Sequence, residues 1–173
     1  PTLRAHDLLV RVAAVSVNPV DAKVRGGGPV GQPVPNPPLI IGWDAVGEVV
    51  ELGPEARRFQ VGDPVYFAGD RTRAGSYAEY VAVDERITGH CPATLTDAQA
   101  AAVPLVALTA WEGLLETLAA DRGDAGLGTR VCLIVGGAGG VGSLAIQIAK
   151  QVCGLTVVAT ASRLESAEYC REL

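Results

Sequence analysis

Methionine is absent from the 173 residues of this chain, and aromatic residues make up only 5% of them. Basic clusters are also missing. The runs Arg57–Arg58 and Arg71–Arg73 are short, acids offset them, and the net charge is −5. A nucleic acid or an anionic membrane is therefore not indicated as a partner. The chain opens at Pro1 with neither an initiator Met nor a signal peptide, and we expect it to be part of a longer protein.

Paired cysteines are a further absence. The four cysteines lie far apart and none forms a CxxC pair; they are Cys91, Cys132, Cys153 and Cys170. This spacing favours reduced thiols in a cytoplasmic protein over disulfides. The stretch from Val131 to Ala149 carries no charge and is long enough to span a membrane, but its glycines cluster at 136–142. A buried strand, a glycine turn and a helix explain it better.

The first part of the chain is rich in short segments of strand character. β-Branched and aromatic residues predict strands at Leu8–Val17, Ala45–Leu52, Val65–Phe67 and Ser76–Val83. The segment Gly26–Pro38 is rich in Gly and Pro, which predicts a loop. Several short strands joined by turns indicate a small barrel or sandwich.

A helical pattern follows these strands. Thr96 and Gln99 form a capping box, which predicts that a helix starts at Thr96. Four apolar residues then share one helical face, namely Leu108, Trp111, Leu115 and Leu118. The segment Gly123–Gly128 is interpreted as a linker.

The last part of the chain predicts a βαβ unit. Val131–Val135 is a continuous apolar strand of the kind found inside parallel sheets, and Leu155–Thr160 is a second strand. Val141–Cys153 between them predicts a crossover helix that Gly154 ends. The predicted buried face of this helix holds Val141, Leu144, Ala145, Ile148 and Val152, and the predicted polar stripe holds Ser143, Gln147, Lys150 and Gln151.

The glycine-rich turn between strand and helix carries the chemical signal. Gly137, Gly139 and Gly142 give the spacing GxGxxG, in a segment that also contains Gly140 and Val141. In this pattern the first Gly permits the tight turn, the second lets the backbone approach a pyrophosphate, and the third allows the helix to pack closely on the strand. The helix N-terminus then offers unpaired N–H groups to phosphates. We predict a nicotinamide dinucleotide at this turn.

The end of the second strand indicates which dinucleotide binds. An NAD-binding unit places an acid here for the ribose 2′-OH, whereas this chain has no acid until Glu165. Ser162 can donate to a 2′-phosphate, and Arg163 can pair with it through charged hydrogen bonds. We therefore predict NADPH rather than NADH.

These residues resemble the quinone oxidoreductase (zeta-crystallin) branch of the medium-chain dehydrogenase/reductase superfamily, including bacterial proteins labelled zinc-type alcohol dehydrogenase-like. The similar segments are Asn18–Asp21, Gly42–Val49, Val61–Val65, Leu108–Trp111 and Gly139–Gly142 followed by Gln147 and Lys150. The resemblance implies an α/β chain with a GroES-like β-barrel domain at residues 1–104. The first part of a Rossmann doubly wound parallel sheet would follow at 105–173, in a protein twice as long that forms a homodimer.

The resemblance also bears on zinc. Zinc-dependent relatives carry a Cys in the region of Asn18–Asp21 and a His at the position of Trp43, and their four-cysteine structural lobe has no counterpart in this sequence. A catalytic zinc needs three protein ligands, which the adjacent pair His90–Cys91 does not supply. We predict that no metal is bound.

Without a metal, hydrogen-bond donors must stabilise the negative charge that develops on the substrate oxygen. The resemblance points to Asn18 and Thr109 as these catalytic donors, with Lys23, Arg25 and Tyr66 as weaker candidates. Asn18 can equally be a turn residue before Pro19, and Thr109 can be a structural helix hydroxyl.

Three classes of function stay open at this point. The leading hypothesis is a zinc-independent reductase that transfers hydride from NADPH to a quinone or another conjugated carbonyl. An enoyl-thioester or alkenal reductase of the same branch is the alternative among such enzymes. A non-catalytic binding or structural module with the same fold belongs to a different class, and a zinc alcohol dehydrogenase is the weakest reading.

Overall fold

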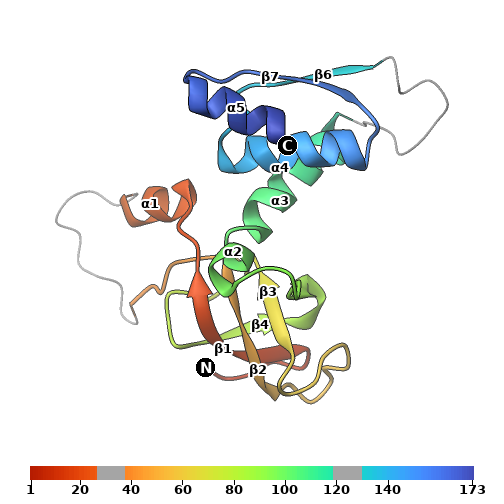
Figure 1. Ribbon diagram of the computed structural model, residues 1–173. Coiled ribbons are helices and arrows are strands. Elements are labelled where there is room, and N and C mark those ends of the chain that lie inside the picture. Colours follow the sequence, from red (N-terminus) through yellow and green to blue (C-terminus); the bar gives the residue numbers. More distant parts are fainter. Residues whose placement is uncertain (27–37, 119–129) are drawn as a thin grey trace. The chain divides into compact units, whose positions relative to one another are not determined.

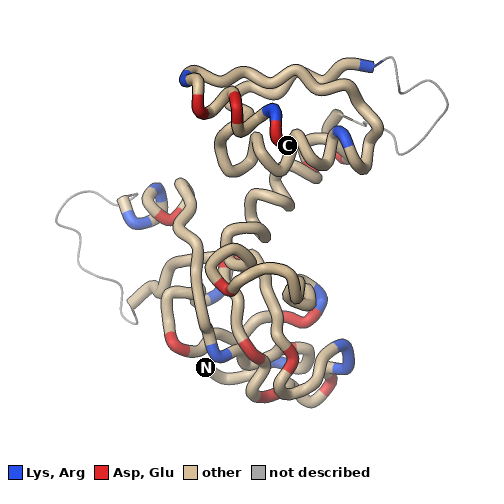
Figure 2. The backbone as a smooth tube through the Cα atoms, viewed as in Figure 1, with Lys and Arg blue, Asp and Glu red and all other residues tan. Residues whose placement is uncertain are grey.

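The computed structural model describes residues 1–26, 38–118 and 130–173 (Figure 1). These residues form two compact units, Pro1–Leu105 and Val106–Leu173. Acidic and basic residues are interspersed along the backbone of each unit (Figure 2). Except for Gly26 and Pro38, the predicted loop lies outside the described residues, as does the predicted linker at 123–128.

The first unit is built on one antiparallel sheet of five strands in the order β4-β1-β2-β3-β5. The strands are β1 (Asp7–Val15), β2 (Ala45–Leu52), β3 (Pro64–Phe67), β4 (Tyr80–Asp84) and β5 (Thr88–His90). The sheet curls into a half-barrel (Figure 1). The prediction of β2 is confirmed residue for residue, because a β-branched run between turn residues favours a strand.

Alternate residues of these strands fill the inside of the half-barrel. Leu8, Val10, Val49 and Val65 are completely buried, and Phe67 is 2% exposed. Burying each of these side chains stabilises the fold by about 1.5–3 kcal/mol. Two register shifts in β1, at Leu9/Val10 and Val12/Ala14, interrupt the pairing of β1 with β2.

The strand predicted at Ser76–Val83 is shorter than expected and begins only at Tyr80. The backbone N–H groups of Ser76 and Tyr77 donate instead to the carbonyl oxygens of Gly42 and Ile41. The local sequence pattern gives no sign that Ser76 and Tyr77 pair with the segment before β2, which is distant in the sequence. The same contacts bring Ser76 and Tyr77 beside the residues that precede β2.

Short helices lie between the strands of this sheet and after its last strand. They are α1 (Pro19–Gly26), a 3₁₀ turn (Glu85–Ile87), α2 (Asp97–Ala101) and α3 (Pro104–Trp111). The capping box predicted for α2 is confirmed: the Thr96 hydroxyl accepts from the Gln99 N–H, and the Gln99 side chain accepts from the Thr96 N–H. α2 packs on the sheet through Ala100 and Ala101, which are completely buried.

The second unit contains a parallel pair, β6 (Val131–Ile134) and β7 (Thr156–Ala159), joined by the crossover helix α4 (Gly140–Gln151). A π-helical turn (Glu112–Thr117) continues α3, and α5 (Leu164–Glu172) follows β7. The predicted βαβ unit is confirmed. Gly154 ends the connection from α4 with φ +64°, a conformation that favours Gly.

The side-chain faces predicted for the helices need correction. In α4 the buried residues are Gly142, Ser143, Ala145, Ile146 and Ala149, whereas Val141 and Val152 are exposed. Gly142 is buried because α4 packs so closely on the turn before it that a larger side chain would not fit there. The pattern Leu108, Trp111, Leu115 and Leu118 also fails, since Leu108 and Leu118 are exposed while Ala110 and Leu114 are buried.

Strand β6 also differs from the buried strand that was predicted. Val131 and Leu133 are more than 60% exposed, and only Ile134 of β6 is fully buried. Among the described residues, α4 and its neighbours cover one face of the two-stranded sheet, through a cluster that includes Ile134, Ile146 and Leu155. The other face of β6 therefore carries apolar side chains without a covering layer in the described part of the chain.

One stretch of the described residues, Asp97–Thr117, is long and apolar enough to cross a membrane by length and composition alone. The stretch comprises α2, α3 and the π-helical turn. A single stretch of this kind is weak support for a membrane span, because core helices of soluble proteins pass the same test.

Candidate active site and nucleotide turn

Asn18 and Asp44 meet in the interior of the first unit. Asn18 precedes α1 and is 5% exposed, and Asp44 precedes β2 and is completely buried. The Asn18 Nδ2 donates to Asp44 Oδ2 over 2.7 Å. The structure therefore fixes the side chain of a predicted site residue with a partner 26 positions away in the sequence.

The other two oxygen atoms of Asp44 also accept hydrogen bonds. Its Oδ1 accepts from the Leu105 N–H over 2.8 Å, and its backbone oxygen accepts from the Ser76 hydroxyl over 3.1 Å. Burial raises the pKa of Asp44 and the negative charge of Asp21 adds to this, while the hydrogen bonds from Asn18 and Leu105 act in the opposite direction. The carboxylate is thus desolvated, and its hydrogen bonds compensate in part.

Asp21 and Tyr77 extend this network. Asp21 Oδ2 accepts from the Asn18 N–H over 2.5 Å and from the Tyr77 hydroxyl over 2.9 Å. Burial first, and then the hydrogen bond to Asp21, raises the pKa of Tyr77 to about 12. Asp21 Oδ1 is buried and has no hydrogen-bond partner among the described residues. A phenol with this pKa is poorly matched to proton donation at neutral pH.

An apolar cavity of about 300 Å³ lies in the same unit. Its lining includes Val20, Leu39, Ile41, Trp43 and Leu105. Trp43 precedes Asp44, and Leu105 is the residue whose N–H binds Asp44. The cavity therefore shares residues with the surroundings of the Asn18–Asp44 pair.

The other donors predicted for the substrate lie elsewhere. Thr109 is exposed on α3 in the second unit, so it and Asn18 belong to different units. Lys23 and Arg25 are exposed in the last turn of α1. Tyr66, on β3, packs against the cluster beneath α2. Among the described residues of the first unit, no hydrogen bond joins Asn18 to Lys23, Arg25 or Tyr66.

The glycine turn joins β6 to α4 and is held by Thr160. The N–H groups of Gly136 and Gly137 donate over 2.9 Å to the side-chain and backbone oxygens of Thr160, which follows β7. Gly136 has φ +72°, so Gly136 rather than Gly137 supplies the left-handed conformation of the turn. This corrects the role expected of the first Gly in the pattern.

Gly137 and Gly142 are needed for packing instead. A Cβ on Gly142 would lie 2.3 Å from the Gly136 carbonyl oxygen, and one on Gly137 would lie 2.8 Å from the Ala159 Cβ. Gly139 is the N-cap of α4 and has no side chain to cover the helix end, while Gly139, Gly140 and Val141 are exposed. The first turn of α4 is therefore exposed and has no side-chain cap, as an anion site requires.

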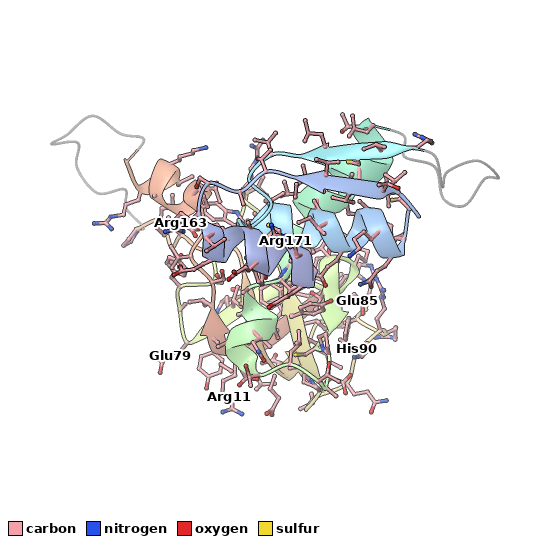
Figure 3. The ribbon with its side chains drawn as sticks, turned by 45° about the horizontal axis from the view of Figure 1, so that its top comes forward. Arg11, Glu79, Glu85, His90, Arg163 and Arg171 are labelled. Carbon is pink, nitrogen blue, oxygen red and sulfur yellow. The ribbon has the colours of Figure 1, made fainter. Side chains whose placement is uncertain are left out.

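Ser162 and Arg163 lie at the same edge of the parallel sheet as this turn. Both residues follow β7, and parallel strands end at one edge. Both side chains are exposed, and Arg163 is the N-cap of α5 without a side-chain capping bond. Figure 3 shows Arg163 and Arg171 near opposite ends of α5.

Among the described residues, no group of three His, Cys, Asp or Glu side chains is arranged to hold a metal. The ring of His90 packs against Phe59 at a tilt of 44° with centroids 4.5 Å apart, and burial raises the pKa of the neighbouring Cys91 thiol. No disulfide forms among the four cysteines, all of which are described.

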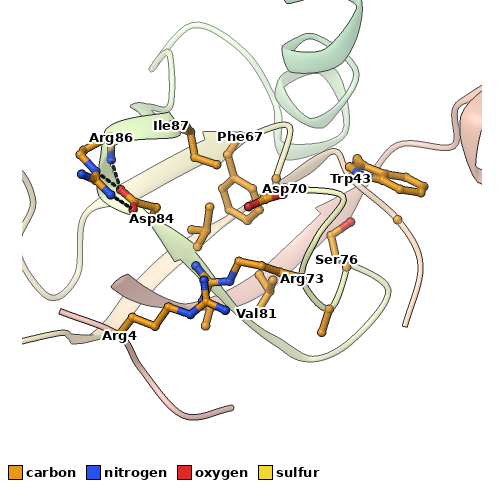
Figure 4. Close-up of a pocket in the computed structure, with 16 residues that line it drawn as sticks. Arg4, Trp43, Phe67, Asp70, Arg73, Ser76, Val81, Asp84, Arg86 and Ile87 are labelled. Carbon is orange, nitrogen blue, oxygen red and sulfur yellow. Dashed lines mark hydrogen bonds and ion pairs between the residues drawn. The ribbon is translucent and has the colours of Figure 1, made fainter. Parts of the chain in front are cut away.

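A polar cavity of about 220 Å³ adjoins the apolar cavity, with which it shares Trp43 and Arg73 (Figure 4). Its lining includes Arg4, Asp70, Arg73, Asp84 and Arg86. The charges compensate one another: Arg86 pairs with Asp84, and Arg73 makes two hydrogen bonds of 2.8 and 2.6 Å to the buried Asp7. This balance of charge points to structural pairing.

Sequence reasoning missed Asp44, Asp21 and Tyr77 as members of the site. One signal was available: Asp44 is an acid at the head of the apolar strand β2, where a charge needs a buried partner. Nothing local in the sequence indicated that this partner is Asn18.

Known proteins share the half-barrel of this chain. Residues 4–93 match the family described as the alcohol dehydrogenase GroES-like domain. The zinc-type alcohol dehydrogenase-like protein of Staphylococcus aureus (strain MSSA476) is 41% identical over 173 residues, which are 100% of this chain and 50% of that protein. The chloroplastic NADPH-dependent alkenal/one oxidoreductase of Arabidopsis thaliana is 39% identical over 182 residues, 100% of this chain and 44% of that protein.

Solved structures show the same fold. An alcohol dehydrogenase superfamily protein from Novosphingobium aromaticivorans matches with a TM-score of 0.86 and 41% identity, covering 99% of this chain and 50% of that chain. The quinone oxidoreductase from Coxiella burnetii matches with a TM-score of 0.75 and 36% identity, covering 98% and 52%. The chain spans about half the length of the curated relatives it matches.

Proposed function

The chain belongs to the family of alcohol dehydrogenase GroES-like domains, and from this premise we propose that it serves hydride transfer from NADPH to a quinone or another conjugated carbonyl, without a catalytic zinc. The observation that carries the proposal is the turn Gly136–Gly142. Gly139 leaves the N-terminus of α4 uncovered, and Gly142 contacts the Gly136 backbone so closely that a Cβ would not fit. Such a cradle suits a pyrophosphate.

The residues present fit a nicotinamide dinucleotide phosphate. The exposed N–H groups of Gly140 and Val141 would hold the pyrophosphate, and Ser162 with Arg163 would hold the 2′-phosphate. When bound, the nicotinamide supplies the hydride. The Arabidopsis relative, which is named as NADPH-dependent, supports this choice of cofactor.

At the substrate end, this chain would supply shape and hydrogen-bond donors. The apolar cavity lined by Trp43 and Leu105 suits a flat apolar group such as a quinone ring. Asn18 would donate to the oxygen on which negative charge develops, and the family resemblance also assigns a donor role to Thr109. The likeness to the quinone oxidoreductase of Coxiella burnetii supports this substrate class.

The Arabidopsis relative, an alkenal/one oxidoreductase, favours a second candidate. An alkenal, an enone or an enoyl thioester presents the same conjugated oxygen to the same donors, so the two candidates differ in the substrate and not in the chemistry. A non-catalytic module of this fold is the contrasting class. The proposal also includes a cytoplasmic location, which the spacing of the cysteines favours, and a homodimeric full-length protein.

The test is a comparison of substrates. Purified protein is mixed with NADPH and either a quinone, a 2-alkenal or an enoyl thioester, and the loss of NADPH absorbance is followed. We expect turnover of quinone that survives treatment with a chelator. Turnover of enoyl thioesters alone would replace the first candidate with the second, and stoichiometric zinc in a metal analysis would overturn the zinc-independent mechanism. NADPH binding without turnover of any substrate would favour the non-catalytic module.

A further inference from the structure

We propose that Asp44 is a positioning residue, whose two carboxylate oxygens hold the Asn18 amide and the first turn of α3 together. The inference rests on the proposed function, in which Asn18 donates to the substrate oxygen. Asp44 itself is buried away from solvent and acts only through the residues that it holds.

Each carboxylate oxygen of Asp44 accepts one hydrogen bond. Oδ2 accepts from Asn18 Nδ2 over 2.7 Å, and Oδ1 accepts from the Leu105 N–H over 2.8 Å. Because α3 begins at Pro104, which has no N–H, Leu105 carries the first backbone donor of that helix. A negative charge at a helix N-terminus is electrostatically favourable. Asp44 thus caps α3 from a position 61 residues earlier in the chain.

Asp44 is held in place by its own surroundings. Its side chain is completely buried, its backbone oxygen accepts from the Ser76 hydroxyl, and the next residue begins β2. Few rotamers satisfy both acceptor bonds at once. The position of the Asn18 amide is therefore set by the sheet and not by solvent.

The contact also sets which way round the amide lies. An ionised carboxylate can only accept hydrogen bonds, so Asn18 must turn its NH2 group, and not Oδ1, toward Asp44. One hydrogen of Nδ2 is used in this bond and the second stays on the same fixed nitrogen. That second N–H is the donor that the proposed function assigns to the substrate oxygen.

The substitution Asp44→Asn tests this assignment because it keeps the shape and removes the charge. If the introduced amide keeps its oxygen toward the Leu105 N–H, its NH2 group faces Asn18, and the Asn18 amide must rotate to present Oδ1. We expect the side-chain amide signals of Asn18 to shift in a ¹⁵N–¹H NMR spectrum. We also expect kcat to fall on the order of 10- to 100-fold with KM nearly unchanged, as for other residues that orient a reacting group.

Two further variants separate positioning from general stability. The exchange Asn18→Asp with Asp44→Asn removes the repulsion between the two carboxylates that Asn18→Asp alone would create, so we expect it to recover the thermal stability lost in Asn18→Asp but not the turnover. Asp63→Asn is the matched control. Asp63 also accepts a backbone N–H, from Gln60 over 2.8 Å, but in an exposed turn, and this variant should keep both the Asn18 signals and kcat.

The outcomes distinguish this inference from the proposed function. Unchanged Asn18 signals in the Asp44→Asn variant would overturn the positioning role, whatever the activity. Unchanged kcat in that variant, beside a loss of kcat in Asn18→Ala, would overturn it as well. If the unmodified protein turns over no substrate, the proposed function fails, and the NMR comparison alone decides whether Asp44 orients Asn18.

Discussion

The amide of Asn18 donates to the buried carboxylate of Asp44 over 2.7 Å, which joins the residue before α1 to the residue before β2. Replacing Asn18 with Ala removes this donor and leaves the Asp44 oxygen without it. We expect kcat to fall by about 10²–10³, the usual effect of losing one donor to a developing oxyanion. Unfolding should become easier by about 1–3 kcal/mol, because a buried acceptor loses its partner.

Ser76→Ala provides the control for that prediction. It removes a hydrogen bond to the backbone oxygen of the same Asp44 and leaves the Asn18 contact in place. Thermal unfolding should show a loss of stability in both variants, whereas steady-state kinetics should show a much larger loss of kcat in Asn18→Ala than in Ser76→Ala. Equal kcat in the two variants would contradict a site role for Asn18.

Gly142→Ala should distort the turn Gly136–Gly142. The added Cβ would lie 2.3 Å from the Gly136 carbonyl oxygen and 2.9 Å from the Gly137 Cα, so α4 must move away from the turn. We expect a loss of about 1–3 kcal/mol of stability, typical of overpacking, together with a loss of dinucleotide binding.

Gly113→Ala is the matched substitution in the same unit, because nothing lies within 4 Å of the added Cβ. Its stability should be unchanged or raised by up to about 1 kcal/mol, since Ala favours helix over Gly. Calorimetry and NADPH titration of the two variants check the prediction. It is wrong if both bind NADPH as the unmodified protein does.

The sequence predicted the fold class well and the faces of its helices poorly. The GroES-like half-barrel that the resemblance implied is confirmed. The βαβ unit and the capping box at Thr96 are confirmed as well, because each depends on a local pattern or on turn chemistry. The buried face of α4 was right only in part, since Ala145 is buried and Leu144 and Ile148 pack against the core, whereas Val141 is exposed. Gly142 and Ser143 lie against the turn, where only small side chains fit, and hydrophobicity gives no sign of that.

The candidate site was predictable only in part for a related reason. The glycine turn is contiguous in sequence, so its spacing predicted a phosphate cradle. The Asn18–Asp44–Leu105 contacts join three distant segments, and only the folded sheet brings them together. The roles predicted for Asn18, Thr109, Ser162 and Arg163 stay predictions.

The stability of the first unit should depend on pH through Asp7 and Arg73. Burial raises the pKa of Asp7, but the hydrogen bonds from Arg73 and from the Arg4 N–H outweigh it and hold the pKa below its usual value of 3.8. A lowered carboxylate pKa contributes stability above 3.8 that is lost as the pH falls through the folded-state value.

Arg73→Met should therefore cost about 3–5 kcal/mol at pH 7, because it leaves a buried carboxylate unpaired. The difference from the unmodified protein should shrink toward acidic pH, where a protonated Asp7 needs no cation. Urea unfolding across this pH range measures it. Arg11→Met, which breaks the exposed pair with Glu48, should cost no more than about 1 kcal/mol at any pH. A pH-independent loss in Arg73→Met would refute the assignment.

Arg163→Gln should change the preference between cofactors. Arg163 is exposed at the start of α5, beside the edge of the sheet where the turn lies, and its proposed partner is the 2′-phosphate. We expect NADPH to bind about 10-fold more weakly, the loss of one charged hydrogen bond, with NADH unaffected. Arg171→Gln, on the last turn of the same helix, should alter neither affinity. Equal losses for both cofactors would point to a structural role for Arg163.

We propose above that the turn Gly136–Gly142 holds the pyrophosphate of NADPH. This proposal can be tested by titrating the unmodified protein with NADPH and with NADH and following nicotinamide fluorescence. We expect saturable binding of NADPH that is at least about 10-fold tighter than that of NADH, which corresponds to about 1.4 kcal/mol from the 2′-phosphate. Absence of binding by either dinucleotide, in protein with a folded circular dichroism spectrum, would contradict it.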